Sequence, residues 1–152
     1  MTAMPGALPT RKRGSTTASM PAGPPAGADA AMMTKALMEV HAGIDSIAIN
    51  GVLVATRDGL VLCGVTRGVE NDGVAAMAAA AAGLAHQFTS QAGIGGPRAV
   101  FFEGETGQVG VFEVDFATLL VVFGSRNTTM GMFNVVAKQA LALLQQAVAG
   151  LR

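Results

Sequence analysis

Apolar residues recur at steps of three and four near the start of the patterned part of the chain. They are Met33, Leu37, Val40, Ile44 and Ile47. This spacing places them on one side of a helix, while Lys35, Glu39 and Ser46 fall on the other side. Asp29 is available as the N-cap. The pattern predicts an amphipathic first helix.

The spacing of apolar residues then changes from that of a helix to that of two short strands. Residues 51–55 and 60–63 are apolar runs separated by Arg57-Asp58-Gly59. Asp-Gly between two apolar runs is a strong hairpin signal, because glycine readily supplies the positive φ that the turn needs. We therefore expect two antiparallel strands joined by a tight turn.

The rest of the chain predicts a helix, three strands and a last helix. Asn71 or Asp72 is expected to cap the second helix, which runs to about Gln91. Three strand candidates follow, at residues 98–103, 108–115 and 118–123. Thr128 and Thr129, with Asn127, are suited to cap the last helix. One broad apolar face of that helix carries Phe133, Val136, Ala137, Ala140, Leu141, Leu144, Val148 and Leu151.

This order, αββαβββα, predicts an α+β fold. A five-stranded antiparallel meander covered by three helices is the simplest arrangement that buries every apolar face.

The second helix has two contrasting faces. At 100° per residue, its large apolar side chains form one stripe, which we expect to pack on the sheet. That stripe holds Val74, Met77, Ala81, Leu84 and Phe88. The opposite face carries Ala75, Ala79, Gly83, His86 and Ser90.

No Lys, Arg, Asp or Glu occurs between residues 73 and 91. A face without charge is easily desolvated, so we predict that this helix is the main contact surface of the protein. The competing interpretation is that alanine is present only as a good helix former.

Composition limits the class of protein. The chain has 152 residues, of which 51% are hydrophobic and 13% charged, and its mean hydropathy is +0.47. No unbroken apolar run of about eighteen residues is present to span a membrane. Ten basic and ten acidic residues balance to zero, so no basic field indicates nucleic-acid binding.

The first thirty residues differ from the rest. They hold five of the six prolines, and no large apolar cluster could offset the entropy of ordering them. We expect a disordered tail over 1–30 and one domain over 31–152. Polar residues follow the basic run at 11–13 where a secretory signal would be apolar, which favours a cytoplasmic location.

Candidate chemistry is sparse. His41 and His86 lack the spacing and the partners of a zinc site, and Cys63, the single cysteine, falls within a predicted strand and is expected to be buried. No phosphate-binding or dinucleotide-binding glycine motif is complete. We therefore expect no metal and no cofactor. Arg57 and Arg126 lie in predicted loops, where a solvated side chain is expected and an arginine finger is the alternative.

Several segments together resemble the Roadblock/dynein light-chain family, in its bacterial MglB-like branch. Residues 52–62, VLVATRDGLVL, resemble its first hairpin, and 74–85, VAAMAAAAAGLA, its alanine-rich central helix. Residues 118–123, TLLVVF, followed by a short loop and MGM at 130–132, complete the likeness. The resemblance covers about residues 31–152 and leaves out the tail.

The resemblance implies a Roadblock/profilin-like fold and a homodimer. The third strand, carrying Arg98, Val100 and Phe102, would pair with its copy, and the central helices would lie side by side. Such pairing buries an open sheet edge.

It also implies a Ras-like small GTPase as partner, bound through the helix pair. Carried onto this chain, the docking positions are Ala75, Ala79 and Gly83, with His86 at the polar rim. The resemblance supplies no catalytic residue, so we expect a regulator of the GTPase and not an enzyme.

Two alternatives stay open. An assembly scaffold would use the same surface without changing GTP hydrolysis. A small-ligand sensor would need a pocket with a few convergent polar groups, and the predicted core is almost entirely aliphatic or phenylalanine.

Overall fold

The computed structural model describes residues 34–39, 42, 49–126 and 128–150. Residues 34–39 are helical, in agreement with the predicted first helix, and Leu37 is buried. The rest of that helix, its expected cap and the expected tail over 1–30 lie outside the described residues.

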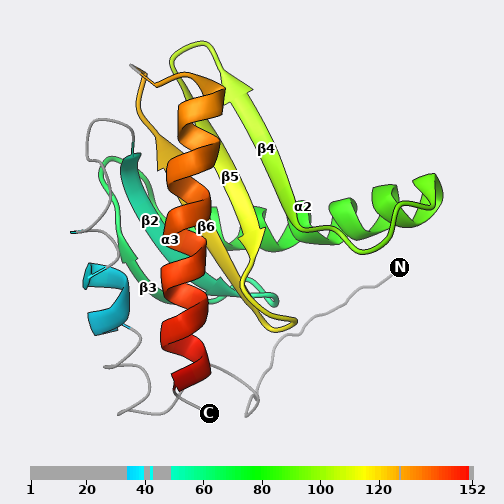
Figure 1. Cartoon of the computed structure of the whole chain (residues 1–152), viewed down its shortest axis with the longest axis horizontal. Helices are drawn as coiled ribbons and strands as arrows, with labels where there is room; N and C mark the ends of the chain where they lie inside the picture. The colour runs from blue at the N-terminus through cyan, green and yellow to red at the C-terminus, as the bar shows by residue number, and fades with distance from the viewer. Residues whose placement is uncertain (1–33, 40–41, 43–48, 127, 151–152) are drawn as a thin grey trace, which may run out of the picture.

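Five antiparallel strands form one sheet with helices on both faces (Figure 1). The strands are β2 (Ile49–Thr56), β3 (Val61–Val65), β4 (Ala99–Gly104), β5 (Gly107–Glu113) and β6 (Thr118–Gly124). The predicted α+β class and five-stranded antiparallel sheet are confirmed. The strand order is β3-β2-β6-β5-β4, so the sheet is a hairpin joined to a three-strand meander, and β2 pairs with β6. The chain crosses the sheet between β3 and β4, which breaks a continuous meander.

The predicted hairpin turn is present. The Thr56 N–H donates to the Leu60 carbonyl at 2.8 Å, and the Gly59 N–H donates to the Thr56 carbonyl at 3.0 Å. Gly59 has φ +93°, and a Cβ there would lie 3.4 Å from the Cα of Ala76. Glycine is therefore favoured both by the turn and by its contact with the second helix.

Alternation along the strands builds a separate core on each face of the sheet. In β2, Val52 and Val54 join the core under the last helix, and Leu53 and Ala55 join the core under the second helix. All four are fully buried. The central strands are thus apolar on both sides, as expected of strands between two helical layers.

The last helix, α3 (Met130–Gly150), has the predicted orientation. Its buried residues are Phe133, Val136, Ala137, Ala140, Leu144 and Val148, while Leu141 is partly buried and Leu151 lies outside the described residues. The Thr129 hydroxyl oxygen accepts from the Met132 N–H at 3.1 Å, which is the predicted capping role. Neither α3 nor the other long described helix meets the length and hydropathy needed to cross a membrane.

The second helix, α2 (Asn71–Ala92), begins with a different cap from the one predicted. The cap is Glu70, whose carboxylate accepts from the Gly73 N–H at 3.1 Å. Asn71 instead accepts a hydrogen bond from the Thr66 hydroxyl at 2.6 Å. The helix ends at Gly93, which adopts a left-handed conformation with φ +67°.

The predicted orientation of α2 is wrong for its largest side chains, although Val74 and Ala81 of the predicted stripe pack, partly buried, against the core. The residues that pack on the sheet are the alanines Ala75, Ala78 and Ala82. The large side chains expected there are mostly exposed, with 66% of Met77, 54% of Leu84 and 68% of Phe88 accessible to solvent. Small side chains let the helix backbone approach the sheet closely. The larger side chains lie on one side of the helix, away from this contact.

Two adjacent leucines in α3 test the core on that side of the sheet. Leu144 is fully buried and Leu143 is 45% exposed. We expect Leu144→Ala to lower the free energy of unfolding by about 2–5 kcal/mol, because a buried side chain is replaced by a cavity. Leu143→Ala should cost less than about 1 kcal/mol. Urea denaturation of both variants measures the difference, and equal losses would contradict the described packing of α3.

Candidate functional site: an uncovered groove beside α2

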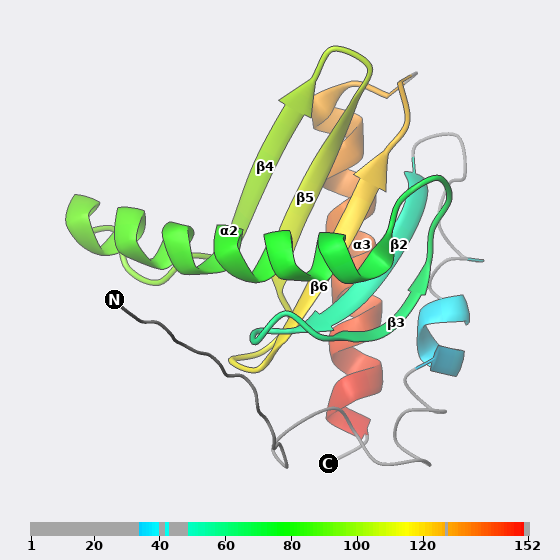
Figure 2. The ribbon, with the colours of Figure 1, turned by 180° about the vertical axis from the view of Figure 1, so that it is seen from behind.

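An apolar groove runs along one side of α2. The helix crosses the middle of the sheet and leaves the upper parts of β4, β5 and β6 uncovered on this face (Figure 2). The groove has a volume of about 440 Å³. Its walls are nearly all apolar: Val74, Met77, Ala78, Ala80, Ala81 and Leu84 from the helix, and Phe102, Val109, Val111, Val121 and Phe123 from the sheet.

The large apolar residues of α2 gather along this groove. Met77 and Leu84 line it, and Phe88 lies one turn beyond Leu84. Phe102, on the opposite wall, is 51% exposed. An apolar strip of this kind, rimmed by few charges, is typical of a surface that another protein covers.

The groove opens at an unpaired sheet edge. β4 pairs with β5 on one side and is the last strand in the sheet order. Val100 packs against the core under α2, Phe102 faces the groove, and Arg98 is exposed just before the strand begins. Val100 and Phe102 therefore lie on an edge strand, whereas Arg98 precedes it; pairing of this edge with a second copy stays a prediction. An exposed, apolar edge is a ready template for strand pairing.

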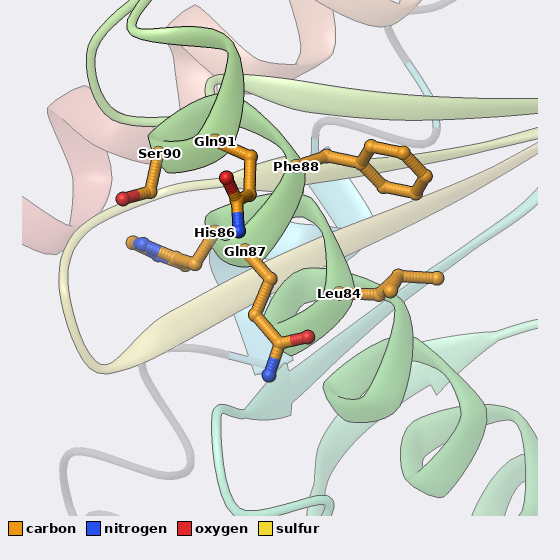
Figure 3. A pocket seen from close by; sticks show the side chains of 6 residues that line it. All are labelled: Leu84, His86, Gln87, Phe88, Ser90 and Gln91. Atoms are coloured by element: carbon orange, nitrogen blue, oxygen red, sulfur yellow. The ribbon is translucent and has the colours of Figure 1, made fainter.

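The C-terminal turns of α2 project beyond β4, as Figure 2 shows. An open hollow of about 810 Å³ surrounds this part of the helix. In Figure 3, Leu84 and Phe88 point to one side of the helix, and His86 and Ser90 point to the other. The projecting segment thus separates an apolar side from a polar side.

A shared carboxylate fixes the polar side of α2 to the sheet. Glu113, near the end of β5, lies 2.7 Å from Arg57 Nη2 through Oε1 and 3.0 Å from His86 Nε2 through Oε2. Arg57 Nε also donates to the Phe116 carbonyl at 2.6 Å. Arg57 is therefore held in place by the sheet and its loops, which argues against the arginine-finger role. Arg126 is exposed.

The outward face of α2 consists of small residues, but not all of the predicted ones. Ala75 is fully buried against the sheet, so its predicted place on the outer surface is wrong. Ala79 is half-buried beside Gly59. Gly83 is exposed as predicted, and Ala76 and Ala80 share its exposure. Residues 76, 80 and 83 lie at four- and three-residue steps and form the outer face.

Sequence reasoning missed the sheet half of the groove, including Phe123 and Val109. The available signal was the alternation in β5 and β6, which places apolar residues on both faces of strands that one helix cannot cover entirely.

The remaining candidate chemistry is weak in the described part of the chain. Burial raises the pKa of the Cys63 thiol to about 11, against a lowering contribution from its hydrogen bond with Thr34. A thiol with so high a pKa is a poor nucleophile at neutral pH. No group of three or more His, Cys, Asp or Glu in the described residues could hold a metal ion. His41 lies outside those residues.

Comparison with known proteins identifies the domain. Residues 44–123 match the family model of the Roadblock/LC7 domain. An uncharacterized protein of Methanocaldococcus jannaschii is 29% identical over 110 residues, which cover 72% of this chain and 90% of that protein.

Solved structures share the fold at low sequence identity. MglB of Myxococcus xanthus superposes with a TM-score of 0.67 at 14% identity, covering 83% of this chain and 94% of that one. The gliding protein MglB of Thermus thermophilus gives 0.69 at 19% identity, with 85% and 97% covered. A Roadblock/LC7 domain of Streptomyces avermitilis gives 0.64 at 18% identity, with 78% and 95% covered. These likenesses show the fold.

The Glu113 contacts make a prediction about stability. Because Glu113→Ala removes the partner of both Arg57 and His86, we expect it to lower the free energy of unfolding by about 1–2 kcal/mol. Arg57→Ala added to it should cost less than the sum of the two single changes, since the pair is already broken. Urea denaturation of the four-member cycle measures this coupling. Glu105→Ala, on an exposed turn, is the control. If the losses of the two single variants add up to the loss of the double variant, Arg57 and Glu113 do not stabilise each other.

Proposed function

Because the chain belongs to the Roadblock/LC7 domain family, we propose that it acts as a homodimeric, non-enzymatic regulator of a Ras-like small GTPase in the cytoplasm. The observation that carries the proposal is the surface of α2, which has an apolar groove on one side and small, uncharged residues facing outward. The sequence resemblance to bacterial family members that bind such GTPases supports the choice of partner.

The first step is dimerisation. A second copy would place its own α2 in the groove, so that Met77, Leu84 and Phe88 of each copy become buried. In the same dimer the β4 edges, with Val100 and Phe102, would pair and join the two five-stranded sheets. One two-fold axis satisfies both contacts, as an isologous interface requires. Burying Phe and Leu side chains that are half or more exposed supplies the driving force.

The second step is docking of the GTPase on the outward face. After dimerisation, Ala76 and Gly83 of both copies would remain at the surface, because neither lines the groove. Their small side chains allow close approach of another backbone, and the absence of charge lowers the cost of desolvation. Ala75 cannot take part, since it is buried under the helix.

Regulation needs no catalytic residue from this chain. A protein that binds one nucleotide state of the GTPase more tightly than the other shifts the population toward that state. If it favours the arrangement of the GTPase's own catalytic groups, hydrolysis accelerates. The scaffold alternative uses the same surface with equal affinity for both states.

Dimerisation is tested by a charge on the apolar side of α2, one turn beyond the groove. Phe88→Glu should raise the dimer dissociation constant by about 100-fold or more, because a buried carboxylate without a partner costs several kcal/mol. The neighbouring residue gives a matched control, since Gln87→Glu adds the same charge at an exposed position. Sedimentation equilibrium measures both variants. A monomeric parent protein, or a Phe88→Glu dimer as tight as the parent, would contradict the proposed dimer.

GTPase docking is tested by a charge on the outer face. Ala76→Glu, at an exposed position of α2 that does not line the groove, should weaken binding of a Ras-like GTPase from the same organism by about tenfold or more while leaving the dimer intact. Ala142→Glu, on an exposed position of α3, is the control. Binding is measured with the GTPase loaded with GDP or with a non-hydrolysable GTP analogue, and hydrolysis is measured in parallel.

Each outcome of this experiment has a distinct meaning. Tighter binding of one nucleotide state, lost in Ala76→Glu, supports regulation through this face. Equal binding of both states with an unchanged hydrolysis rate replaces regulation with the scaffold alternative. Equal loss in both variants contradicts docking on α2.

A further inference from the structure

A second cavity lies on the opposite face of the sheet from the α2 groove. Its volume is about 650 Å³, within the usual range for sites that bind small molecules. It is bounded by α3 on one side and by the connection from α2 to β4 on the other. In Figure 1, α3 covers the middle of the sheet on this face and leaves β4 uncovered.

The floor of the cavity is aromatic. Phe101 and Phe112 line it, with ring centroids 5.5 Å apart in an edge-to-face arrangement. Phe101 also stacks edge-on against Phe133 at 6.4 Å, which fixes its ring although 40% of the residue is exposed. Ile94 and Leu141 add aliphatic walls. An apolar chain or ring would find a preformed surface here.

Among the described residues, every charged one that lines the cavity is basic. Arg98 lies just before β4 and Lys138 on α3, and both are exposed and make no ion pair within the described part of the chain. The acidic residues that the structure describes all lie outside the cavity lining. In a chain with zero net charge, two unpaired cations beside an apolar hollow form a local site for an anion.

One amide beside the cavity has an unsatisfied atom. Asn134 is half-buried and lines the cavity, and its Oδ1 atom is buried without a hydrogen-bond partner among the described residues. A buried acceptor without a donor is unfavourable. A carboxylate has no donor to offer this oxygen, so the choice of ligand depends on the two cations and the aromatic floor.

We propose that this cavity binds a small amphipathic carboxylate, with its carboxylate group between Arg98 and Lys138 and its apolar part over Phe101 and Phe112. Charge-assisted hydrogen bonds from a guanidinium and an ammonium hold the head group, and burial of the apolar part supplies the rest of the affinity. The inference goes beyond the proposed GTPase regulation, because the cavity lies on the other face of the sheet from the α2 groove and reaches α2 only at Thr89.

Decanoate is the probe for this site. Titrated into the full-length protein and followed by amide chemical shifts, it should bind saturably, with the largest shifts at Ile94, Ala99, Phe101, Asn134 and Leu141. Decanol and decyltrimethylammonium have the same chain and test the head group. We expect both to bind about tenfold more weakly than decanoate. Decyltrimethylammonium accepts no hydrogen bond and is repelled by the two cations, and the neutral hydroxyl of decanol forms no ion pair with them.

Charge variants complete the test. Arg98→Gln combined with Lys138→Gln should weaken decanoate binding by about tenfold or more, whereas Arg126→Gln, an exposed arginine that does not line the cavity, should leave it unchanged. All three positions are exposed, so loss of folding is not expected. The inference is overturned if decanoate does not saturate, if the three head groups bind alike, or if the shifts lie along Met77 and Leu84 instead.

Discussion

The close approach of α2 to the sheet is the constraint on which the rest of the structure depends. Ala75, Ala78 and Ala82 contact the sheet with side chains of one methyl group each, and the turn at Gly59 reaches the helix backbone between them. A helix seated this closely has no room for larger residues beneath it. Its larger side chains are therefore turned toward the neighbouring part of the sheet, where they line a groove that the single chain leaves open.

The groove follows from geometry as well as composition. One helix is about 10 Å wide with its side chains, whereas β4, β5 and β6, which it crosses, are about twice that long at about 3.3 Å per residue. A single helix across the sheet cannot cover it. The contact of Glu113 with Arg57 and His86 fixes α2 toward one side, so the uncovered apolar surface is collected on the other side as one strip along the helix.

Most of the fold was predictable because local patterns determine it. The hairpin around Gly59, the three later strands and the buried face of α3 depend on alternation, turn chemistry and helical periodicity, and the structure has them within a residue or two. The cap of α2 was missed because Glu70 is a less usual cap than Asn71 or Asp72. The strand order depends on pairing between β2 and β6, which are distant in sequence, and periodicity carries no information about such pairing.

The orientation of α2 could not be predicted from the same patterns for a deeper reason. A hydrophobic stripe shows that side chains avoid water and does not show whether they are buried by their own chain or by another one. In α3 the stripe of Phe133 and Leu144 is covered by the chain itself. In α2 the stripe of Met77, Leu84 and Phe88 stays exposed, and the alanine face, which resembles an exposed one, forms the core. The useful sequence signal was the unbroken alanine run around Ala78, since close packing on a sheet requires small residues.

β4 shows how one edge strand can serve two surfaces. Alternation places Phe101 and Phe102 on opposite faces. Each is about half exposed, because α3 leaves β4 uncovered on one face and α2 leaves the upper part of β4 uncovered on the other. Phe102 belongs to a groove almost without polar atoms, which suits a second apolar helix. Phe101 belongs to a cavity with two cations, which suits an anion with an apolar part. The strand therefore separates two chemically different sites, and a change that reaches one can leave the other intact, because the sheet between them is filled by buried side chains on both faces.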